Sequence, residues 1–242
     1  MKTQQAKYVS LPSLSPYARG DRYEILKEDH KAIIRKLQKI FGKTASLNVV
    51  DVGCGNGELI YSVKKSFPQW SYTGYDYTED FINTGRKFPG LAGVRLIHKD
   101  LFEIDKIFDL VLCSSVIQIF PDIGPPLNKL LSLCKKGGSL LIDGLFNQFD
   151  IEVRTQFCDN SRPETKGLWR VDWNQHSRRS IIELLKDNVE SVEFEDVIMD
   201  KDIPLDPEMP INRFTFRDSR GRNIITNGTN MMMNRTLLTI KK

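Results

Sequence analysis

Short apolar runs alternate with amphipathic segments over the first two thirds of the chain. Apolar side chains recur with helical spacing over 21–42 and stop at Gly42, which predicts a helix there. Strands alternating with helices are typical of an α/β fold with a doubly wound, mostly parallel sheet covered on both faces. The predicted strands are 47–52, 70–76, 94–100, 108–115 and 137–146, and the helices between them are 58–67, 78–88 and 125–134.

The last third of the chain has a different pattern. Residues 148–176 are polar and lack strong periodicity, which predicts a lid or insertion after the fifth strand. A helix at 177–188, a strand at 190–199, a hairpin within 211–228 and a strand at 235–242 follow, so the sheet is expected to have seven strands. We therefore expect one domain: an arm and helix (1–44), a core (45–147), a lid (148–176), and a C-terminal helix, hairpin and final strands (177–242).

Composition narrows the class of protein. The 242 residues are 40% hydrophobic, and no apolar run approaches the roughly 20 residues that span a bilayer. No secretory segment is visible, and the four cysteines form no CxxC pair, so we expect a cytoplasmic protein with reduced thiols and no metal site. The net charge of +4 is too small to indicate a nucleic-acid partner, and the oligomeric state cannot be read from the sequence.

The most informative stretch is "VVDVGCGNGEL" at 49–59, where glycines follow directly after a strand. Such a turn lets a ligand lie against the backbone at the carboxyl end of a parallel sheet. A dinucleotide site would use the spacing G-x-G-x-x-G and hold a pyrophosphate at the helix N-terminus. Here the spacing is G-x-G-x-G, and Asp51 and Glu58 would repel a pyrophosphate. The pattern favours a cationic or zwitterionic ligand over a nicotinamide cofactor.

This stretch resembles the first motif of the class I S-adenosylmethionine-dependent methyltransferases, in particular the small-molecule type found in bacteria. Four further segments resemble the later motifs in the same order, over about 45–147: "YTGYDYT", "LIHKDLFEI", "FDLVLCSSVIQIF" and "LCKKGGSLLIDGLF". The resemblance implies the Rossmann-like methyltransferase fold. It also implies S-adenosyl-L-methionine as cofactor and S-adenosyl-L-homocysteine as product.

The resemblance also assigns roles in cofactor binding. The loop from Gly53 to Gly57 is expected under the methionine and ribose, Asp76 at the ribose hydroxyls, and Tyr77 against the adenine. Asp100 and the Leu101 amide are expected at the adenine edge. Ser114 and Asp51 are expected near the methionine amino group, although Asp51 could instead hold the loop's shape. The expected cofactor-binding residues are therefore Asp51, Gly53, Cys54, Gly55, Asn56, Gly57, Asp76, Tyr77, Asp100, Leu101 and Ser114. The side chains of Cys54 and Cys113 read as small core residues, not nucleophiles.

The methyl acceptor should bind to segments outside this core. Aromatic and basic side chains there suit a small polar molecule, either neutral or anionic. His176 is the histidine of the predicted lid, and it is our candidate general base if the acceptor arrives as a hydroxyl or an ammonium. His30 and His98 read as structural. The expected substrate-binding residues are Tyr17, Arg19, Gln118, Trp169, Trp173 and Arg213.

The predicted function is transfer of a methyl group to an oxygen or nitrogen of a small molecule. Methylation of nucleic-acid bases is disfavoured because "CSSVIQIF" replaces the N/D-P-P-Y/F motif after the fourth strand. An aminopropyl transferase would need acids there to bind a polyamine, and the segment has none. The alternative left open is an inactive protein that binds S-adenosylmethionine as a regulatory or partner subunit.

Overall fold

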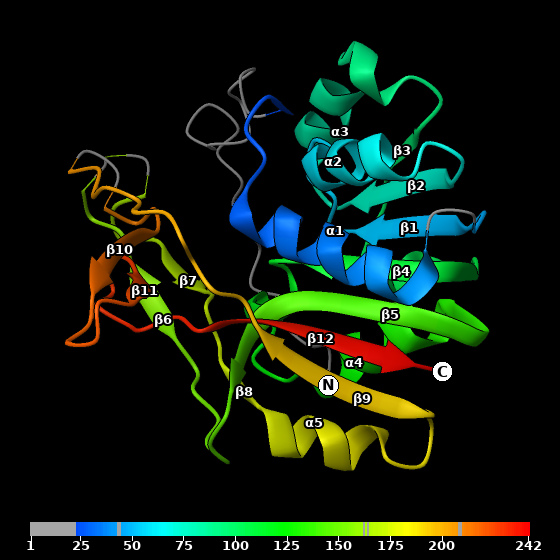
Figure 1. Ribbon diagram of the computed structural model, residues 1–242. Coiled ribbons are helices and arrows are strands. Elements are labelled where there is room, and N and C mark those ends of the chain that lie inside the picture. Colours follow the sequence, from blue (N-terminus) through cyan, green and yellow to red (C-terminus); the bar gives the residue numbers. More distant parts are fainter. Residues whose placement is uncertain (1–22, 43–44, 162, 164, 208–209) are drawn as a thin grey trace.

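The computed structural model describes residues 23–42, 45–161, 163, 165–207 and 210–242. Five parallel strands form the centre of one sheet (Figure 1), in the order β3-β2-β1-β4-β5, and β12 and β9 complete its other edge. The strand β12 runs antiparallel to both β5 and β9. A short strand, β8, extends the edge of β5. The doubly wound, mostly parallel sheet predicted from the sequence is confirmed, with seven strands in the main path and β8 as an eighth.

The elements of the parallel half fall close to their predicted positions. The helix α1 begins at Glu28, seven residues after the start of the predicted segment, and Gly42 ends it as expected at φ 62°. Thr78 is the N-cap of α3, but its side chain makes no capping hydrogen bond. The elements are α1 (Glu28–Phe41), β1 (Asn48–Val52), α2 (Glu58–Ser66), β2 (Ser71–Asp76), α3 (Glu79–Arg86), η3 (Pro89–Leu91), β3 (Arg95–His98), η4 (Leu101–Glu103), β4 (Phe108–Ser114), η5 (Ile117–Ile119), α4 (Gly124–Ser132) and β5 (Cys134–Asn147).

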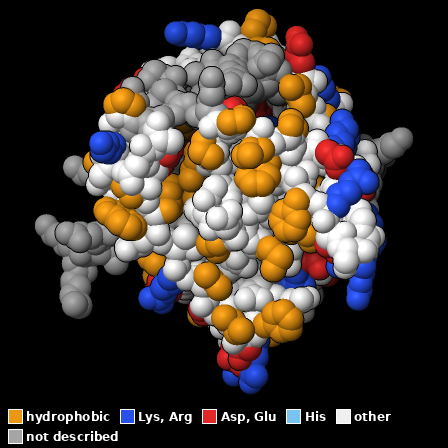
Figure 2. All heavy atoms as spheres, turned by 90° about the vertical axis from the view of Figure 1, so that its left-hand side faces the viewer, with side chains coloured by type: hydrophobic (Ala, Val, Ile, Leu, Met, Phe, Trp, Pro, Cys, Tyr) orange, Lys and Arg blue, Asp and Glu red, His pale blue; other side chains and the backbone are white. Residues whose placement is uncertain are grey.

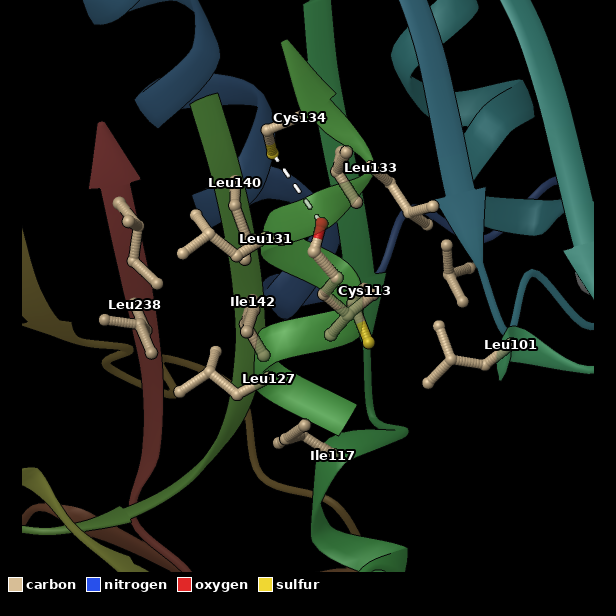
Figure 3. Packing of buried hydrophobic residues seen from close by; sticks show 14 of the residues in the cluster. Leu101, Cys113, Ile117, Leu127, Leu131, Leu133, Cys134, Leu140, Ile142 and Leu238 are labelled. Carbon is tan, nitrogen blue, oxygen red and sulfur yellow. Dashed lines mark hydrogen bonds between the residues drawn. The ribbon is translucent and has the colours of Figure 1, made fainter. Parts of the chain in front are cut away.

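Helices bury apolar side chains against both faces of the sheet. One cluster joins α1, α2 and α3 to the sheet, and the other joins α4 and α5 to it. In Figure 3, Leu127 of α4 lies beside Ile142 of β5 and Leu238 of β12, and Cys113 lies in the same core. Burial raises the pKa of the Cys113 thiol well above its usual range, which makes it unreactive. The prediction that Cys113 is a core residue is consistent with this position.

The chain after β5 adds β8, β9 and β12 to the main sheet and also forms two separate two-stranded hairpins. The segment predicted to be a lid contains regular structure, the antiparallel pair β6–β7. The predicted hairpin is present as β10–β11. The elements are β6 (Gln156–Cys158), β7 (Trp169–Val171), β8 (His176–Ser177), α5 (Arg178–Leu185), β9 (Ser191–Asp196), β10 (Phe214–Arg217), β11 (Asn223–Thr226) and β12 (Arg235–Lys241).

The two hairpins lie together beyond the carboxyl ends of the parallel strands (Figure 1), and we call the described residues within 148–175 and 197–234 the lobe. Thr155 Oγ1 donates to Met231 Sδ over 3.2 Å, and Gln175 Nε2 donates to the Met232 carbonyl over 3.2 Å, so the two parts of the lobe are in contact. Open parallel sheets bind ligands at this edge. The lobe therefore covers the end of the sheet where a site is expected.

Candidate active site

The glycine loop between β1 and α2 is the most constrained part of this edge. Its amides point inward: those of Gly53 and Cys54 donate to the Tyr75 carbonyl over 2.7 and 3.0 Å, and that of Gly57 donates to the Cys54 carbonyl over 2.9 Å. The Gly55 amide donates to Asp76 Oδ2 over 2.7 Å. The sequence suggested that bare amides would face a ligand, and this is wrong for these four. A pyrophosphate needs such free donors, so the loop is unsuited to a dinucleotide.

Gly53 shows why the first glycine is required. It has a φ of 74°, and a Cβ at this position would lie 2.2 Å from Cγ2 of Val116. Real Cβ atoms do not approach other heavy atoms so closely, so the Val116 side chain fills the place that a larger residue would need. The segment that leaves β4 is thus in contact with the glycine loop.

Two acids flank this loop, Asp51 before it and Glu58 after it, as the sequence predicted, and Glu58 forms an ion pair with Lys27. Asp51 is only 2% exposed, and its Oδ1 has no hydrogen-bond partner among the residues that the structure describes. Burial, and to a smaller extent the charge of Asp76, raises the pKa of Asp51 to about 8. A buried carboxyl oxygen without a partner is costly, and a bound cation or hydrogen-bond donor would satisfy it. This supports a ligand with a positively charged group.

Asp76 stands at the end of β2 and fixes two turns. Its Oδ2 accepts from the Gly55 amide, and its Oδ1 accepts from the Thr78 amide over 2.7 Å. Burial raises the pKa of Asp76, although these two hydrogen bonds oppose the shift. A carboxylate has about four acceptor positions, so both oxygens can still accept from a ligand hydroxyl.

A surface depression of about 450 Å³ lies next to Asp76, between the ends of β2 and β3. Tyr77, 54% exposed, and Asp100 both line it, so the structure brings together two residues that the sequence assigned to adenine. Asp100 Oδ1 accepts from the Phe102 amide over 2.8 Å, and Phe102 is also part of the wall. His98, interpreted from the sequence as structural, is exposed and lines the same depression. Leu101 is 9% exposed and packs in the core.

The end of β4 contacts a buried ion pair that the sequence did not predict. Ser114 Oγ, predicted near the amino group of the cofactor, donates to Asp143 Oδ2 over 2.8 Å. Asp143 is fully buried in β5 and forms an ion pair with Arg235 of β12. The one sequence signal was a charged residue inside the apolar run at 137–146. Its partner, 92 residues further along the chain, could not be identified from spacing.

The segment predicted to be a lid contacts η5, which follows β4. The backbone amide and the side-chain amide of Asn174 both donate to the Gln118 carbonyl, over 3.0 and 2.8 Å. Gln118 is 5% exposed, and its Oε1 has no hydrogen-bond partner among the described residues. Gln118, predicted to bind substrate, thus lies at the junction between the end of β4 and the lid.

His176 is more deeply buried than a lid residue was expected to be. It is 1% exposed, its Nδ1 lies 3.1 Å from Glu152 Oε2, and its Nε2 is buried beside the backbone of η5. Burial lowers the pKa of His176, and Glu152 opposes that shift. The ring is therefore neutral near pH 7, the form that can accept a proton. In this arrangement Nε2 does not reach the surface.

The other predicted acceptor-binding residues are distributed over the lobe. Trp169 on β7 is 71% exposed, whereas Trp173 lies 4.5 Å from Phe157, ring centre to ring centre, and packs against the cluster around Leu145. Arg213 Nη2 lies 3.8 Å from Asp29 Oδ2, so a carboxylate already neighbours this arginine. Tyr17 and Arg19 lie outside the described residues.

The face of the molecule at this edge is largely apolar in its centre. Figure 2 shows hydrophobic side chains spread over the middle of the face, with most Lys, Arg, Asp and Glu toward its rim. The lobe contributes several of the exposed large apolar residues, among them Trp169, Phe216 and Met232. Within the described ranges, no helix is long and apolar enough to cross a bilayer.

Comparison with known proteins agrees with this geometry. The curated relatives include the demethylmenaquinone methyltransferase of Staphylococcus aureus (strain JH9), 28% identical over 119 residues, which are 47% of this chain and 49% of that protein. The chain thus spans about half the length of the curated relatives it matches.

Solved structures share the fold at low sequence identity. The magnesium protoporphyrin IX methyltransferase of Synechocystis PCC 6803 with bound S-adenosylhomocysteine superimposes with a TM-score of 0.56 at 16% identity, covering 89% of this chain and 82% of that one. The 1,6-didemethyltoxoflavin-N1-methyltransferase of Burkholderia thailandensis gives 0.52 at 15% identity, covering 88% and 77%. The family described as methyltransferase domain matches residues 43–202, and the chain therefore belongs to that family of class I S-adenosylmethionine-dependent methyltransferases.

Proposed function

We propose that this protein transfers a methyl group from S-adenosylmethionine to a small molecule. The observation that carries the proposal is the glycine loop, whose amides are used internally while the buried Asp51 and the partly buried Asp76 lie beside it. Such a loop repels a pyrophosphate and accommodates the positively charged amino and sulfonium groups of S-adenosylmethionine. The unpartnered Oδ1 of Asp51 fits the amino group, and Asp76 fits the ribose hydroxyls.

The proposed roles of the remaining residues follow their places along the sheet edge. Tyr77 and Asp100 would hold the adenine in the depression between β2 and β3. When bound, S-adenosylmethionine supplies an activated methyl group, and its transfer is a direct displacement. The residues of the chain then have two tasks, which are to align the acceptor with the methyl group and to keep water away.

We propose that the acceptor binds between the lobe and the ends of β4 and β5, with the whole chain working as one unit. The acceptor atom is an oxygen or a nitrogen, and the exposed apolar side chains of the lobe would contact an apolar part of the molecule. An anionic group on the acceptor has weaker support, because Asp29 already lies beside Arg213.

His176 is the proposed general base for an acceptor that arrives protonated. Its carboxylate neighbour Glu152 orients the ring through Nδ1, which leaves Nε2 as the atom that would accept the proton. Because Nε2 is buried against η5, this role requires the lid to move when the acceptor binds. An acceptor that is already a carboxylate or phosphate would need no base.

Calorimetric binding tests the proposal directly. We expect S-adenosylhomocysteine to bind in the micromolar range and NAD not to bind, and tighter binding of NAD would overturn the assignment. Asp76→Asn should weaken S-adenosylhomocysteine binding by roughly 10–100-fold, because it replaces one charged acceptor oxygen, and a hydrogen bond to a charged group contributes about 1.5–3 kcal/mol. Asp100→Asn should cost less, since Asp100 would accept a single bond from a neutral amine.

Asp122→Asn is the matched control for these two variants. Asp122 also accepts an amide hydrogen bond at the start of a helix, from Gly124 over 2.9 Å, but it is exposed and lies in the segment between η5 and α4. Its substitution should leave binding unchanged. A transfer assay distinguishes an active enzyme from an inactive binding protein. The protein is incubated with methyl-labelled S-adenosylmethionine and fractionated small-molecule extracts, and we expect the label to appear in a molecule of one fraction. Binding without transfer to any fraction would favour the inactive alternative.

A further inference from the structure

A buried ion pair lies directly beneath the exit of β4. Arg235 of β12 is 3% exposed and Asp143 of β5 is fully buried. Arg235 Nε donates to Asp143 Oδ1 over 3.0 Å, and its Nη2 contacts Asp143 Oδ2 as well, so the guanidinium is held at two points. Such a two-point pair is geometrically specific, and Lys cannot reproduce it.

The same arginine reaches the first residue after β4. Arg235 Nη2 donates to Ser115 Oγ over 2.8 Å, and the Ser115 amide donates to the Asp143 carbonyl over 2.8 Å. Ser115 has a φ of 60°, a left-handed conformation that is strained for a residue with a side chain. Arg235 therefore holds the side chain of Ser115, and the main chain of β5 holds its amide, in a conformation that Ser115 would not adopt unaided.

The consequence of this conformation is seen at the next residue. Val116 follows Ser115 and places its Cγ2 where a Cβ of Gly53 would lie. A change of conformation at Ser115 would move Val116 away from the glycine loop, which would then lose the contact that supports its first glycine.

We propose that Arg235 is a positioning residue for the cofactor site. It acts through Ser115 and Val116 to hold the glycine loop in its binding shape, and it need not touch the cofactor. The inference rests on the proposed function for its effect on binding, but the effect on the loop itself can be measured without any ligand.

The pair also connects the loop to the lobe. Asp29 Oδ2 in α1 lies 3.6 Å from Arg235 Nη2 and 3.8 Å from Arg213 Nη2. Burial would raise the pKa of Asp29, but the two arginines hold it well below its usual range, so Asp29 is ionised at neutral pH. A single carboxylate thus lies between the residue that positions the loop and an arginine of the lobe.

The test combines Arg235→Lys with Ser115→Gly. Lys cannot contact Asp143 at two points and also reach Ser115, so Arg235→Lys should weaken S-adenosylhomocysteine binding about tenfold. It should also speed amide hydrogen exchange in the peptide 49–59 of the ligand-free protein. Glycine adopts a φ of 60° without cost, so adding Ser115→Gly to Arg235→Lys should restore both readouts to near the wild-type values.

The single variants at Ser115 give a second measurement if Arg235→Lys does not fold. Ser115→Ala keeps the left-handed strain and loses the hydroxyl, so we expect faster exchange and about threefold weaker binding, while Ser115→Gly should show neither. The matched control is Arg178→Lys, because Arg178 makes a similar contact, to Asp196 and to Thr236 Oγ1, away from β4. It should change neither readout.

Unchanged exchange in Arg235→Lys, or a double variant no better than Arg235→Lys alone, would overturn the proposal. If the wild-type protein binds no S-adenosylhomocysteine while exchange follows the expected pattern, the proposed function fails and the positioning of the loop by Arg235 stands. Calorimetry and exchange together therefore separate the two.

Discussion

The sheet and the lobe are built on different principles. In the sheet, each functional side chain stands at a strand end, and its place is fixed by long ladders of backbone hydrogen bonds and by apolar clusters on both faces. The lobe has two short hairpins, a small buried cluster around Leu145 and several exposed apolar side chains. In the function proposed above, the sheet is the rigid half that binds the cofactor, and the lobe is the half that contacts the acceptor.

Substitution of His176 is expected to give the largest effect, and it tests whether the lobe takes part in the reaction of the acceptor. With the acceptor found by the transfer screen, His176→Asn should lower turnover by roughly 10²–10⁴-fold, the usual effect of losing a general base. Affinity for S-adenosylhomocysteine should be unchanged, because the ring lies in the lid anchor and not at the glycine loop. Unchanged turnover would mean that His176 only fastens the lid through Glu152.

Substitution of Gly53 tests the rigid half. Gly53→Ala places a Cβ 2.2 Å from Val116 Cγ2, so one of the two segments must move, and we expect binding of S-adenosylhomocysteine to weaken by about 100-fold. Gly93→Ala is the control: Gly93 has a similar φ of 81°, but a Cβ there meets no atom within 4 Å. Both variants should lose about 1 kcal/mol of stability to backbone strain. A similar loss of binding in Gly93→Ala would show that strain, not the clash, matters.

Asp51 should make the affinity of the sheet for the cofactor depend on pH. Its raised pKa of about 8 means that the free protein carries a proton there at pH 7, and this proton must leave before the carboxylate can pair with an ammonium group. Affinity for S-adenosylhomocysteine should therefore rise between pH 6 and pH 8, by up to about tenfold per unit, and level off above the pKa. Calorimetry in buffers of different ionisation enthalpy should detect the released proton.

Asp51→Asn is the corresponding control, and it should flatten that profile. It should also raise the melting temperature at pH 9, because a group whose folded pKa exceeds its unfolded value costs stability once the pH has risen through the folded pKa. A pH profile of binding that keeps its slope in Asp51→Asn would assign the proton to another group.

The smallest effects are expected for two tryptophans of the lobe, Trp169 and Trp173. Trp169→Ala should change the free energy of unfolding by less than about 0.5 kcal/mol, since the side chain is exposed, whereas Trp173→Ala should cost about 2 kcal/mol by removing a packed ring. Trp169→Ala should raise the KM for the acceptor a few-fold and leave cofactor binding unchanged. Urea unfolding and steady-state kinetics measure the two effects, and an equal loss of stability would show that both rings are structural.

The same division explains what the sequence could predict. The strands, the glycine loop and the place of Asp76 follow from local pattern, because the apolar run, the turn and the strand end lie within a few residues of one another. Tyr77 and Asp100, both assigned to the adenine by the resemblance, line one depression, because adjacent parallel strands bring their carboxyl ends together.

The inward direction of the loop amides could not be predicted, because it depends on the carbonyl of Tyr75 in the neighbouring strand. The Arg235–Asp143 pair and the contact of Arg213 with Asp29 join residues far apart in the chain. The burial of His176 depends on how the lid packs against η5, and no local pattern in a polar segment encodes that. The missed features are thus those that require the tertiary structure.

The position of β12 has a consequence for the order of folding. It follows β9 in the sequence, yet it lies between β5 and β9 in the sheet, so β9 cannot join until β12 has paired with β5. Pairings between segments distant in the chain form slowly, and Arg235 arrives with this strand. A ribosome-bound chain that has not yet exposed residue 235 can carry the complete glycine loop and still lack the group that shapes it. We expect the full affinity for the cofactor to appear only once residue 235 is exposed, and not to grow gradually as the earlier strands emerge.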